Sequence, residues 1–361
     1  MVVAGGGVHC AGASDELSCL QEEASLPVYT TNMGKGAVDE FHPLSLGVLG
    51  ALTGPRSLGR YSQALISEVD LVVLIGTRTN QNGTDSWRQI PAGAKVVHID
   101  VDPCEIGRNY EALRLAGDAR ETIAALCSAL SALDLSARHS GRAGLEERIR
   151  GFWSHFEADR LPFSSSNASP IRPERLMAEL QTLLSPDVTV VADASYSSMW
   201  ILGQLRAVAG GTRFITPRGL AGLGWGLPLA LGAKVADPTR PVVAVVGDGG
   251  FAHSWAELET MIRMELPITI ILLNNGILGY QRDAEMVKFR NYTSACHLGD
   301  VDHSRIAEAC GCAAVRISDP ALLAEHLRRG ISDGKPLLID VVTDAEAHPP
   351  LSLFAAMDAA A

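Results

Sequence analysis

The sequence lacks the features that would indicate a membrane, secreted or nucleic-acid-binding protein. No apolar run approaches the roughly 20 residues that span a bilayer, and the first residues show neither a basic segment nor a long apolar one. Only 30 Lys and Arg stand against 41 Asp and Glu, and the resulting net charge of −11 disfavours nucleic acid or an anionic membrane as partner. The seven cysteines form no CxxC pair, which favours free thiols in a reducing compartment. We therefore expect a cytoplasmic protein.

A chain of 361 residues with 47% hydrophobic and 20% charged residues has room for two folded domains. Residues 1–135 alternate short apolar segments with helical ones, which predicts a parallel, doubly wound sheet. We expect buried strands at Val2–Ala4, Pro27–Thr31, Leu71–Gly76 and Lys95–Val101. The helices of this domain are expected at Ser14–Glu23, Gln63–Glu68 and Ala119–Leu133.

The pattern changes over residues 136–172, where we expect a helix at Gly144–Ala158 and a linker over residues 163–170. A second alternating unit follows over residues 173–345, and residues 346–361 form a tail expected to lie on the surface. The strands of the second unit are expected at Val188–Ala192, Arg213–Thr216, Val242–Val246, Ile268–Leu273, Ala314–Ile317 and Pro336–Val342, with helices at Trp255–Met264 and Ser304–Cys310. The predicted fold class is α/β, with two doubly wound parallel-sheet domains.

Polar residues follow two apolar strands of the second unit. Asp248 stands among Gly247, Gly249 and Gly250, and the pair Asn274–Asn275 follows the next strand. Ligands bind at the carboxyl ends of strands in open α/β sheets, and glycines let backbone amides approach a phosphate. Carboxylate, amide and carbonyl oxygens are the ligands that Mg²⁺ prefers. The pattern predicts a Mg²⁺–diphosphate site, although a Gly-Asp-Gly sequence alone is also typical of a tight turn.

The combination resembles the thiamine diphosphate signature, in which GDG precedes NN by about two dozen residues. Here 24 residues separate Gly249 from Asn274. The segments RGLAGLGWGLPLALGAKVA (218–236) and NNGILGYQ (274–281) resemble the cofactor loops of the acetohydroxyacid (acetolactate) synthase-like family. The segments GGGVHCAGASDEL, HPLSLGVLG and VVHIDVDPCEIGRNY resemble the middle domain of the same enzymes. The resemblance implies a Rossmann-like middle domain over residues 1–135 and a diphosphate-binding domain over residues 173–345.

The resemblance assigns roles to individual residues. It implies that the side chains of Asp248 and Asn275 and the backbone carbonyl of Ile277 hold Mg²⁺. Leu223 would force the bent shape of the cofactor, and the Ala221 carbonyl and Leu223 amide would bind its aminopyrimidine. The alternative for Leu223 is plain core packing. The remaining cofactor contacts fall at Ser197, Ser198, Gly247, Gly249, Gly250, Leu278, Gly279 and Tyr280. For residues 195–198 a helix N-cap is a further reading, compatible with the first.

The glutamate that activates the cofactor belongs, in this family, to a pyrimidine-binding domain that the chain does not match. We therefore expect that glutamate on a separate subunit, in a dimer or tetramer of heterodimers, with a truncated or degenerate gene product as the alternative. The resemblance implies decarboxylation of a 2-keto acid such as pyruvate and transfer of the acyl carbanion to a carbonyl acceptor. A simple 2-keto acid decarboxylase and a non-catalytic, cofactor-binding regulatory subunit stay open.

Some positions depart from the family pattern. Asn82 replaces an arginine that reads the substrate carboxylate, and Ala284 replaces a tryptophan that selects the larger keto-acid acceptor. A roomier or less anionic acceptor is therefore expected. FAD stays open against a plain glycine-rich turn, because the flavin positions of the synthases fall at Gly5–Gly7, Thr31–Met33, Arg78 and Asp118, but Asn80 replaces an aspartate. We expect no zinc site, because no standard spacing is met by Cys296, His297, His303, Cys310 and Cys312.

Overall fold

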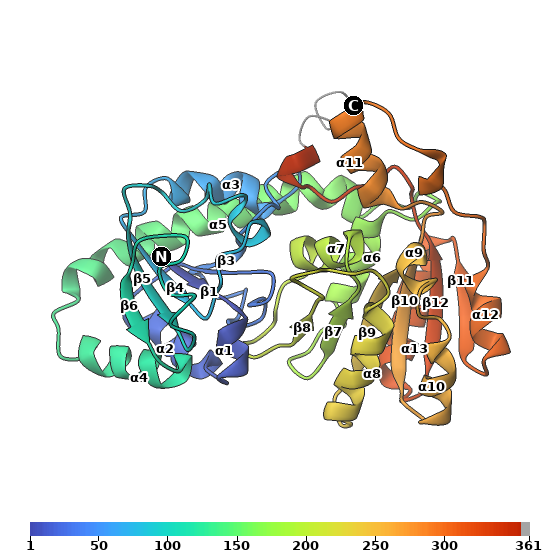
Figure 1. Ribbon diagram of the computed structural model, residues 1–361, viewed down its shortest axis with the longest axis horizontal. Helices are drawn as coiled ribbons and strands as arrows, with labels where there is room; N and C mark the ends of the chain where they lie inside the picture. Colours follow the sequence, from blue (N-terminus) through green and yellow to red (C-terminus); the bar gives the residue numbers. More distant parts are fainter. Residues whose placement is uncertain (355–361) are drawn as a thin grey trace. The chain divides into compact units, whose positions relative to one another are not determined.

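The computed structural model describes residues 1–354, which divide into two compact units (Figure 1). Unit 1 comprises residues 1–159 together with the short stretches 206–212 and 350–352. Unit 2 comprises residues 160–205 and 213–349, with residues 353–354 at the end of the described chain. Each unit contains one sheet of six parallel strands, so the predicted α/β class with two parallel-sheet domains is confirmed.

The sheet of unit 1 has the order β3-β2-β1-β4-β5-β6, which is the doubly wound order of Rossmann-like domains. The chain moves outward from β1 through β2 to β3 and then returns to the other side of β1 with β4, so the order reverses between β1 and β4. The strands are β1 (Val2–Ala4), β2 (Val28–Thr30), β3 (Ser45–Val48), β4 (Leu71–Ile75), β5 (Lys95–Asp100) and β6 (Leu113–Ala116).

Helices cover both faces of this sheet, with α1, α2 and α4 on one face and α3 and α5 on the other (Figure 1). Alternate residues of β1 supply the two cores, because successive strand side chains point to opposite faces. Val2 packs in a cluster with Leu17 of α2, whereas Val3 packs in a cluster with Leu65 of α3. The helices are α1 (Gly6–Cys10), α2 (Ser14–Glu23), α3 (Leu58–Ile66), α4 (Ala119–Leu130) and α5 (Ser136–Ser164), with a 3-10 turn η1 (Asn82–Thr84).

Helix α5 is longer than predicted. It begins at Ser136 rather than at Gly144, and it ends at Ser164 inside the expected linker, with Pro162 in its last turn. Tertiary contacts hold its first turns, because Arg138 donates from Nε to the Ala24 carbonyl (2.8 Å) and Arg142 forms an ion pair with Glu22 (2.7 Å). The strands β3 and β6 also had no counterpart in the prediction, and α3 begins five residues before the predicted helix.

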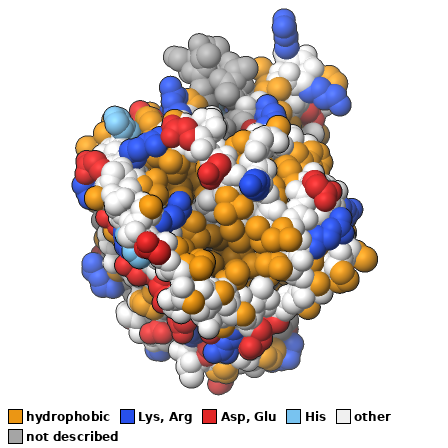
Figure 2. Space-filling view, turned by 90° about the vertical axis from the view of Figure 1, so that its left-hand side faces the viewer, with side chains coloured by type: hydrophobic (Ala, Val, Ile, Leu, Met, Phe, Trp, Pro, Cys, Tyr) orange, Lys and Arg blue, Asp and Glu red, His pale blue; other side chains and the backbone are white. Residues whose placement is uncertain are grey.

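The β6 edge of the first sheet carries exposed apolar side chains. Leu113 on β6 is 65% exposed, and Val101, directly after β5, is 75% exposed. Figure 2 views the side on which β6 and α4 lie in Figure 1, and hydrophobic side chains gather there in a hollow. The edge strand is therefore solvent-exposed, which explains why it lacks the apolar signature of a buried strand.

The sheet of unit 2 has the order β11-β12-β10-β9-β7-β8. The chain runs from β7 to the edge strand β8 and then returns to the other side of β7 with β9, so the order reverses between β7 and β9. Ligand sites of open α/β sheets lie outside the carboxyl ends of the strands at such a reversal. The strands are β7 (Thr189–Ala192), β8 (Phe214–Ile215), β9 (Val242–Gly247), β10 (Ile268–Asn274), β11 (Ala313–Ile317) and β12 (Leu337–Val342).

The core of unit 2 joins the sheet to its helices. Buried residues of β9 and β10, such as Ala244 and Ile270, pack in one cluster with Leu227 of α8 and Leu258 of α10. The helices are α6 (Pro173–Gln181), α7 (Tyr196–Gln204), α8 (Gly226–Ala236), α9 (Asp248–Phe251), α10 (Glu257–Arg263), α11 (Gly279–Phe289), α12 (His303–Ala309) and α13 (Leu323–Ser332), with 3-10 turns η2 (Ser294–Cys296), η3 (Pro320–Leu322) and η4 (Ser352–Phe354).

Within residues 1–354, no helix is both long enough and apolar enough to cross a membrane. The tail predicted over residues 346–361 is described only as far as Phe354, and residues 355–361 lie outside the described part of the chain.

Candidate functional site

Three strand ends of unit 2 meet at the point where the strand order reverses. Ala192 of β7 pairs with Val245 of β9, and Leu273 of β10 pairs with Gly247 of β9. The residues that follow these pairs are Asp193, Asp248 and Asn274, so they emerge at the same edge of the sheet. The topology therefore brings together the polar groups singled out in the sequence.

Asp248 is buried at the start of α9. Its Oδ2 accepts a hydrogen bond from the Gly276 N–H (2.7 Å), and its Oδ1 accepts one from its neighbour Gly249 (2.8 Å). Burial raises the pKa of the Asp248 carboxyl above its ordinary value, whereas the N–H donors oppose that rise. A bound cation would offset the cost of burying this charge.

The segment that follows β10 is held next to Asp248 by backbone hydrogen bonds. The Leu278 N–H donates to the Cys296 carbonyl (2.8 Å), and the Leu298 N–H donates to the Gly276 carbonyl (2.8 Å). Asn275 Oδ1 accepts a hydrogen bond from the Ile277 N–H (3.2 Å) and keeps a second lone pair for a ligand. The predicted metal ligands Asp248, Asn275 and Ile277 therefore lie on adjoining, fixed pieces of backbone.

The two neighbouring asparagines differ in what they contact. Asn274 is buried, and its Nδ2 donates to Asp340 Oδ1 of β12 (2.9 Å) and to the Val301 carbonyl (3.0 Å). Asp340 Oδ2 in turn accepts from the His303 N–H (3.0 Å). Asn274 thus ties β10 to its neighbouring strand, and Asn275 is the asparagine that remains for a ligand. Sequence reasoning did not find Asp340.

The glycines around Asp248 are sites of close approach. A Cβ on Gly249 would lie 2.4 Å from Leu278 Cδ2, and one on Gly250 would lie 2.0 Å from Asp193 Oδ2. A Cβ on Gly247 would lie 3.5 Å from Ser197 Oγ. The predicted cofactor residues after β7, β9 and β10 are therefore neighbours in space.

The predicted serines lie in the first turn of α7. Both Ser197 and Ser198 are buried, and the Ser198 hydroxyl donates to the Ser195 carbonyl (2.9 Å). Ser195 is the N-cap residue of α7, but its side chain makes no capping hydrogen bond. The N-cap position expected within residues 195–198 is therefore confirmed at Ser195, although no serine side chain makes the capping hydrogen bond there. Ser195 also has φ of +67° and ψ of −145°, a backbone conformation that suits glycine better than serine.

Asp193 anchors the loop that carries Ala221 and Leu223, and sequence reasoning missed it. Its Oδ2 accepts from the Gly224 N–H (3.0 Å), and its Oδ1 accepts from the Trp225 N–H (3.1 Å). Leu223 is 39% exposed, so core packing does not account for it. A sequence signal for Asp193 did exist, because an acidic residue directly after a buried strand occupies the same position as Asp248.

Arg218 precedes this loop and was also missed. Its Nη2 donates to Ser198 Oγ (2.8 Å), and its Nε is buried without a hydrogen-bond partner in the structure. Its guanidinium is also near the predicted cofactor residue Tyr280. A positive side chain therefore stands next to the predicted diphosphate contacts.

A buried polar cluster joins the first turn of α7 to α11. The Tyr196 hydroxyl donates to Asp283 Oδ2, and Arg282 Nε donates to Asp283 Oδ1 (2.7 Å). The ring of Tyr196 meets that of Tyr280 edge-on, with centroids 6.0 Å apart. These contacts fix the start of α11, where Gly279 and Tyr280 lie, against the first turn of α7. This turn carries Ser197 and Ser198 and is called the serine turn below.

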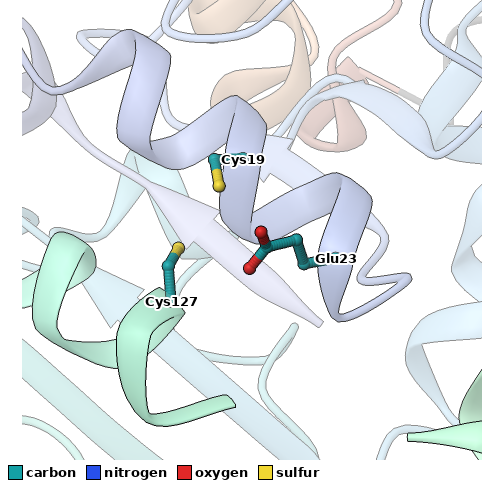
Figure 3. Close-up of side chains that lie close together, drawn as sticks. All are labelled: Cys19, Glu23 and Cys127. Atoms are coloured by element: carbon teal, nitrogen blue, oxygen red, sulfur yellow. The ribbon is translucent and has the colours of Figure 1, made fainter. Parts of the chain in front are cut away.

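The cysteines and histidines weighed for zinc take other partners. Cys296 Sγ contacts Glu285, Cys312 Sγ contacts the Ala313 carbonyl, and the ring of His297 packs on Tyr292. Among residues 1–354, the grouping of potential metal ligands lies in unit 1 instead, where Cys19 and Glu23 of α2 face Cys127 of α4 with ligand atoms within 4.8 Å of one another (Figure 3).

The thiols of this grouping are not reactive ones. Burial and the neighbouring Cys19 raise the pKa of Cys127 to about 12, and burial raises that of Cys19 as well. Both are therefore protonated near neutral pH, and a thiol is a much weaker nucleophile and metal ligand than a thiolate.

The residues weighed for flavin lie in unit 1. Asp118 caps α4, because its carboxylate accepts from the Arg120 N–H (2.9 Å) and the Glu121 N–H. Gly5 and Gly7 pack against the backbone of Gly76, and Arg78 is exposed. The structure thus gives Gly5, Gly7 and Asp118 roles within the fold itself.

Comparison with known proteins places this geometry in a family. Residues 1–126 match the family described as "Thiamine pyrophosphate enzyme, central domain", and residues 193–341 match "Thiamine pyrophosphate enzyme, C-terminal TPP binding domain". The first range contains all six strands of the sheet of unit 1. The second range begins at Asp193, directly after β7, and contains Asp248 and Asn275.

Curated relatives extend the match over nearly the whole chain. A "Probable acetolactate synthase large subunit" of Methanocaldococcus jannaschii is 34% identical over 97% of this chain and 58% of its own length. An "Acetolactate synthase large subunit" of Parasynechococcus marenigrum is 33% identical over 94% of this chain and 53% of its own length. A "Putative thiamine pyrophosphate-containing protein YdaP" of Bacillus subtilis is 29% identical over 97% and 57%, respectively. The chain thus spans a little over half the length of these relatives. It belongs to the thiamine pyrophosphate enzyme family and carries that family's central domain and C-terminal cofactor-binding domain.

Proposed function

We propose that this chain is the large subunit of a split, thiamine-diphosphate-dependent carboligase of the acetolactate synthase type. Such an enzyme decarboxylates a 2-keto acid, for which pyruvate is the simplest candidate, and transfers the acyl carbanion to a carbonyl acceptor to give an acyloin. The observation that carries the proposal is the convergence of Asp248, Asn275 and the serine turn of α7 where the second sheet reverses its order.

The residues present fit Mg²⁺ and a diphosphate. Asp248 and Asn275 offer a carboxylate and an amide oxygen, the Ile277 carbonyl offers a third, and oxygen donors suit this ion. Leu278 and Asp193 lie where side chains on Gly249 and Gly250 would stand, and glycines at such a turn let a phosphate approach the backbone closely. The cofactor, when bound, supplies the carbon nucleophile and accepts the electron pair released with carbon dioxide. The chain's own part is to bind and orient it.

A partner subunit is part of the proposal. The loop held by Asp193 presents apolar side chains to solvent, with Leu220 fully exposed, Trp225 56% exposed and Leu223 39% exposed. Exposed apolar side chains gathered beside a polar site mark a surface that another molecule covers. We assign this surface to a pyrimidine-binding domain that brings the activating glutamate. The relatives, which are longer than this chain, support the assignment.

Calorimetric titration of thiamine diphosphate with Mg²⁺ tests the cofactor assignment. Replacement of Asp248 by Ala should weaken binding by about a hundredfold or more, because it removes a metal ligand outright. The exposed Asp187 is the matched control, and Asp187→Ala should bind as the wild type does. Equal binding by Asp248→Ala and wild type would count against the metal role.

Reconstitution with the pyrimidine-domain subunit tests the reaction. Wild-type complex supplied with [2-¹³C]pyruvate and candidate acceptors should form labelled acyloins, and the large subunit alone should turn pyruvate over negligibly. Acetaldehyde as the single product would instead identify a simple decarboxylase. Unchanged activity of a complex with Asp248→Ala would identify a regulatory subunit.

A further inference from the structure

Arg218 is a cation without a counter-ion in a site that the proposed function fills with anions. No carboxylate lies within 4.0 Å of its guanidinium among residues 1–354, although acidic residues outnumber basic ones in the chain. Its Nε is shielded from solvent and has no hydrogen-bond partner. A half-buried guanidinium with a shielded, unsatisfied N–H is costly unless a ligand supplies the missing acceptor.

The charge of Arg218 persists at neutral pH. Burial lowers the pKa of its guanidinium to about 10, a value still well above 7. Tyr280 is the neighbouring titratable group. Arg218 therefore keeps its positive charge with no carboxylate paired to it directly among residues 1–354.

Ser198 orients Arg218 and cannot itself donate to an anion. A hydroxyl has one hydrogen to donate and two lone pairs to accept with. The hydrogen of Ser198 is directed to the Ser195 carbonyl (2.9 Å), and one lone pair accepts from Arg218 Nη2 (2.8 Å). The donor group at this point of the site is therefore the guanidinium and not the hydroxyl.

We propose that Arg218, held in place by Ser198, binds an oxyanion at the carboxyl edge of the second sheet, next to the serine turn of α7. The inference rests on the proposed function for the origin of the anion. Two anions share the required chemistry, namely the diphosphate of the cofactor and the carboxylate of the 2-keto acid. The planar guanidinium fork suits both, because it donates parallel hydrogen bonds to two oxygens.

Calorimetry on the full chain with Mg²⁺ separates the two sources. One arm titrates inorganic pyrophosphate, and the other titrates pyruvate in the presence of saturating thiamine diphosphate. Arg218→Gln, which keeps a side chain of similar reach without the charge, should weaken one of the two anions by about tenfold or more. Weaker pyrophosphate binding assigns Arg218 to the cofactor, and weaker pyruvate binding with unchanged pyrophosphate assigns it to the substrate. Arg213→Gln, at an exposed position close in sequence, is the control and should match wild type in both arms.

A mutant cycle tests the role of Ser198. Ser198→Ala should weaken the same anion as Arg218→Gln but less strongly, and the double variant should be no worse than Arg218→Gln alone. Arg218→Lys should recover part of the affinity, because it restores the charge without the fork. Additive losses in the cycle would show that Ser198 binds the anion by itself and would overturn the arrangement proposed here.

The outcomes also separate this inference from the proposed function. If wild type binds pyrophosphate in a manner that Asp248→Ala abolishes, while Arg218→Gln equals wild type in both arms, only the assignment of Arg218 is wrong. If the wild-type chain binds neither probe, the proposed function and the role of Arg218 both fall.

Discussion

The two units contain glycine-rich turns at equivalent places, but different groups of the chain pack against the glycines of each turn. Each follows a central strand where the sheet order reverses, after β1 in unit 1 and after β9 in unit 2. In unit 1 the chain's own backbone occupies the space, since a Cβ on Gly5 would lie 2.2 Å from the Gly76 carbonyl oxygen. In unit 2 the side chains of Leu278 and Asp193 occupy the space beside Gly249 and Gly250, and the turn carries the buried carboxylate of Asp248.

The difference shows what a glycine motif can and cannot indicate. Glycine marks a close approach of some group to the backbone, and that group can be another strand's loop as well as a ligand. Ligand chemistry is indicated by the donors around the glycines, which in unit 2 are two carboxylates, an amide and a guanidinium. Unit 1 offers no comparable set around Gly5 within the described residues.

Gly5→Val should have the largest effect. The added side chain would overlap the Gly76 carbonyl and the Thr77 side chain, and backbone cannot move aside cheaply. We expect a loss of about 3 kcal/mol or more of unfolding free energy, measured by denaturant unfolding. Gly93→Ala is the control, because no atom lies within 4 Å of its Cβ position. Wild-type stability of Gly5→Val would show that the turn has free space for a ligand.

Asp193→Ala tests unit 2, where the Asp193 carboxylate lies against Gly250 of the glycine-rich turn. The variant leaves the N–H groups of Ala194, Gly224 and Trp225 without their acceptor, and we expect a loss of about 2 kcal/mol. Limited proteolysis should also show faster cleavage within residues 218–225, with Asp187→Ala as the control. Unaltered proteolysis would mean that other contacts hold the loop.

A glycine can be required by a close contact, as at Gly5, or by a left-handed backbone. Gly12→Ala, just after α1, tests the second reason alone. No atom lies within 4 Å of the Cβ position of Gly12, but its φ is +62°. Only the left-handed backbone penalises a side chain there, so the expected loss is about 1 kcal/mol. Gly12→Asn should lose less, because asparagine tolerates this conformation. A loss as large as that of Gly5→Val would contradict the distinction.

A dependence on pH should be the smallest effect and should come from unit 1. His98 is buried, its Nε2 bonds to the Thr77 carbonyl (3.0 Å), and its Nδ1 accepts from the Gly107 N–H. Burial lowers the pKa of His98 below its ordinary value of 6.5. The unfolded chain therefore binds more protons below that pH, and unfolding free energy falls as pH drops from about 6.5 through the folded-state value. His98→Asn should flatten this slope in thermal unfolding between pH 7 and pH 5, and an unchanged slope would exclude His98 as its source.

Most buried strands could be predicted from the sequence, because their apolar runs are set by the sheet and its helices; the buried edge strand β3, with the sequence SLGV, is the exception. The prediction for β1 agrees with the structure at both ends, and that for β7 begins one residue early. The edge strand β6 could not be predicted, since its exposed residues carry no burial pattern. The start of α5 was missed because Gly141 and Gly144 disfavour a helix locally, and the contacts of Arg138 and Arg142 that support it come from residues more than 100 positions away.

The residues of the candidate site also differ in whether the sequence alone could identify them. Asp248 and Asn275 could be found because strand ends and glycines are visible in the sequence. Asp193 has the same position after a buried strand as Asp248, but its role depends on backbone N–H groups of another segment, which the local pattern does not show. Arg218 acts through a serine of another segment, and no local pattern reveals that contact. Asn274 and Asn275 are adjacent and chemically identical, so only the fold tells which one is used up by Asp340.

The parallel arrangement of both sheets also bears on how the protein comes to be folded. Every neighbouring pair of strands needs a crossover connection, so no hairpin can form early and locally. The first strand, Val2–Ala4, is central and must wait for β4 at residues 71–75 before its second edge is covered. Domains with such distant pairings fold slowly and expose strand edges meanwhile. Lower temperature during expression should therefore raise the yield of soluble chain.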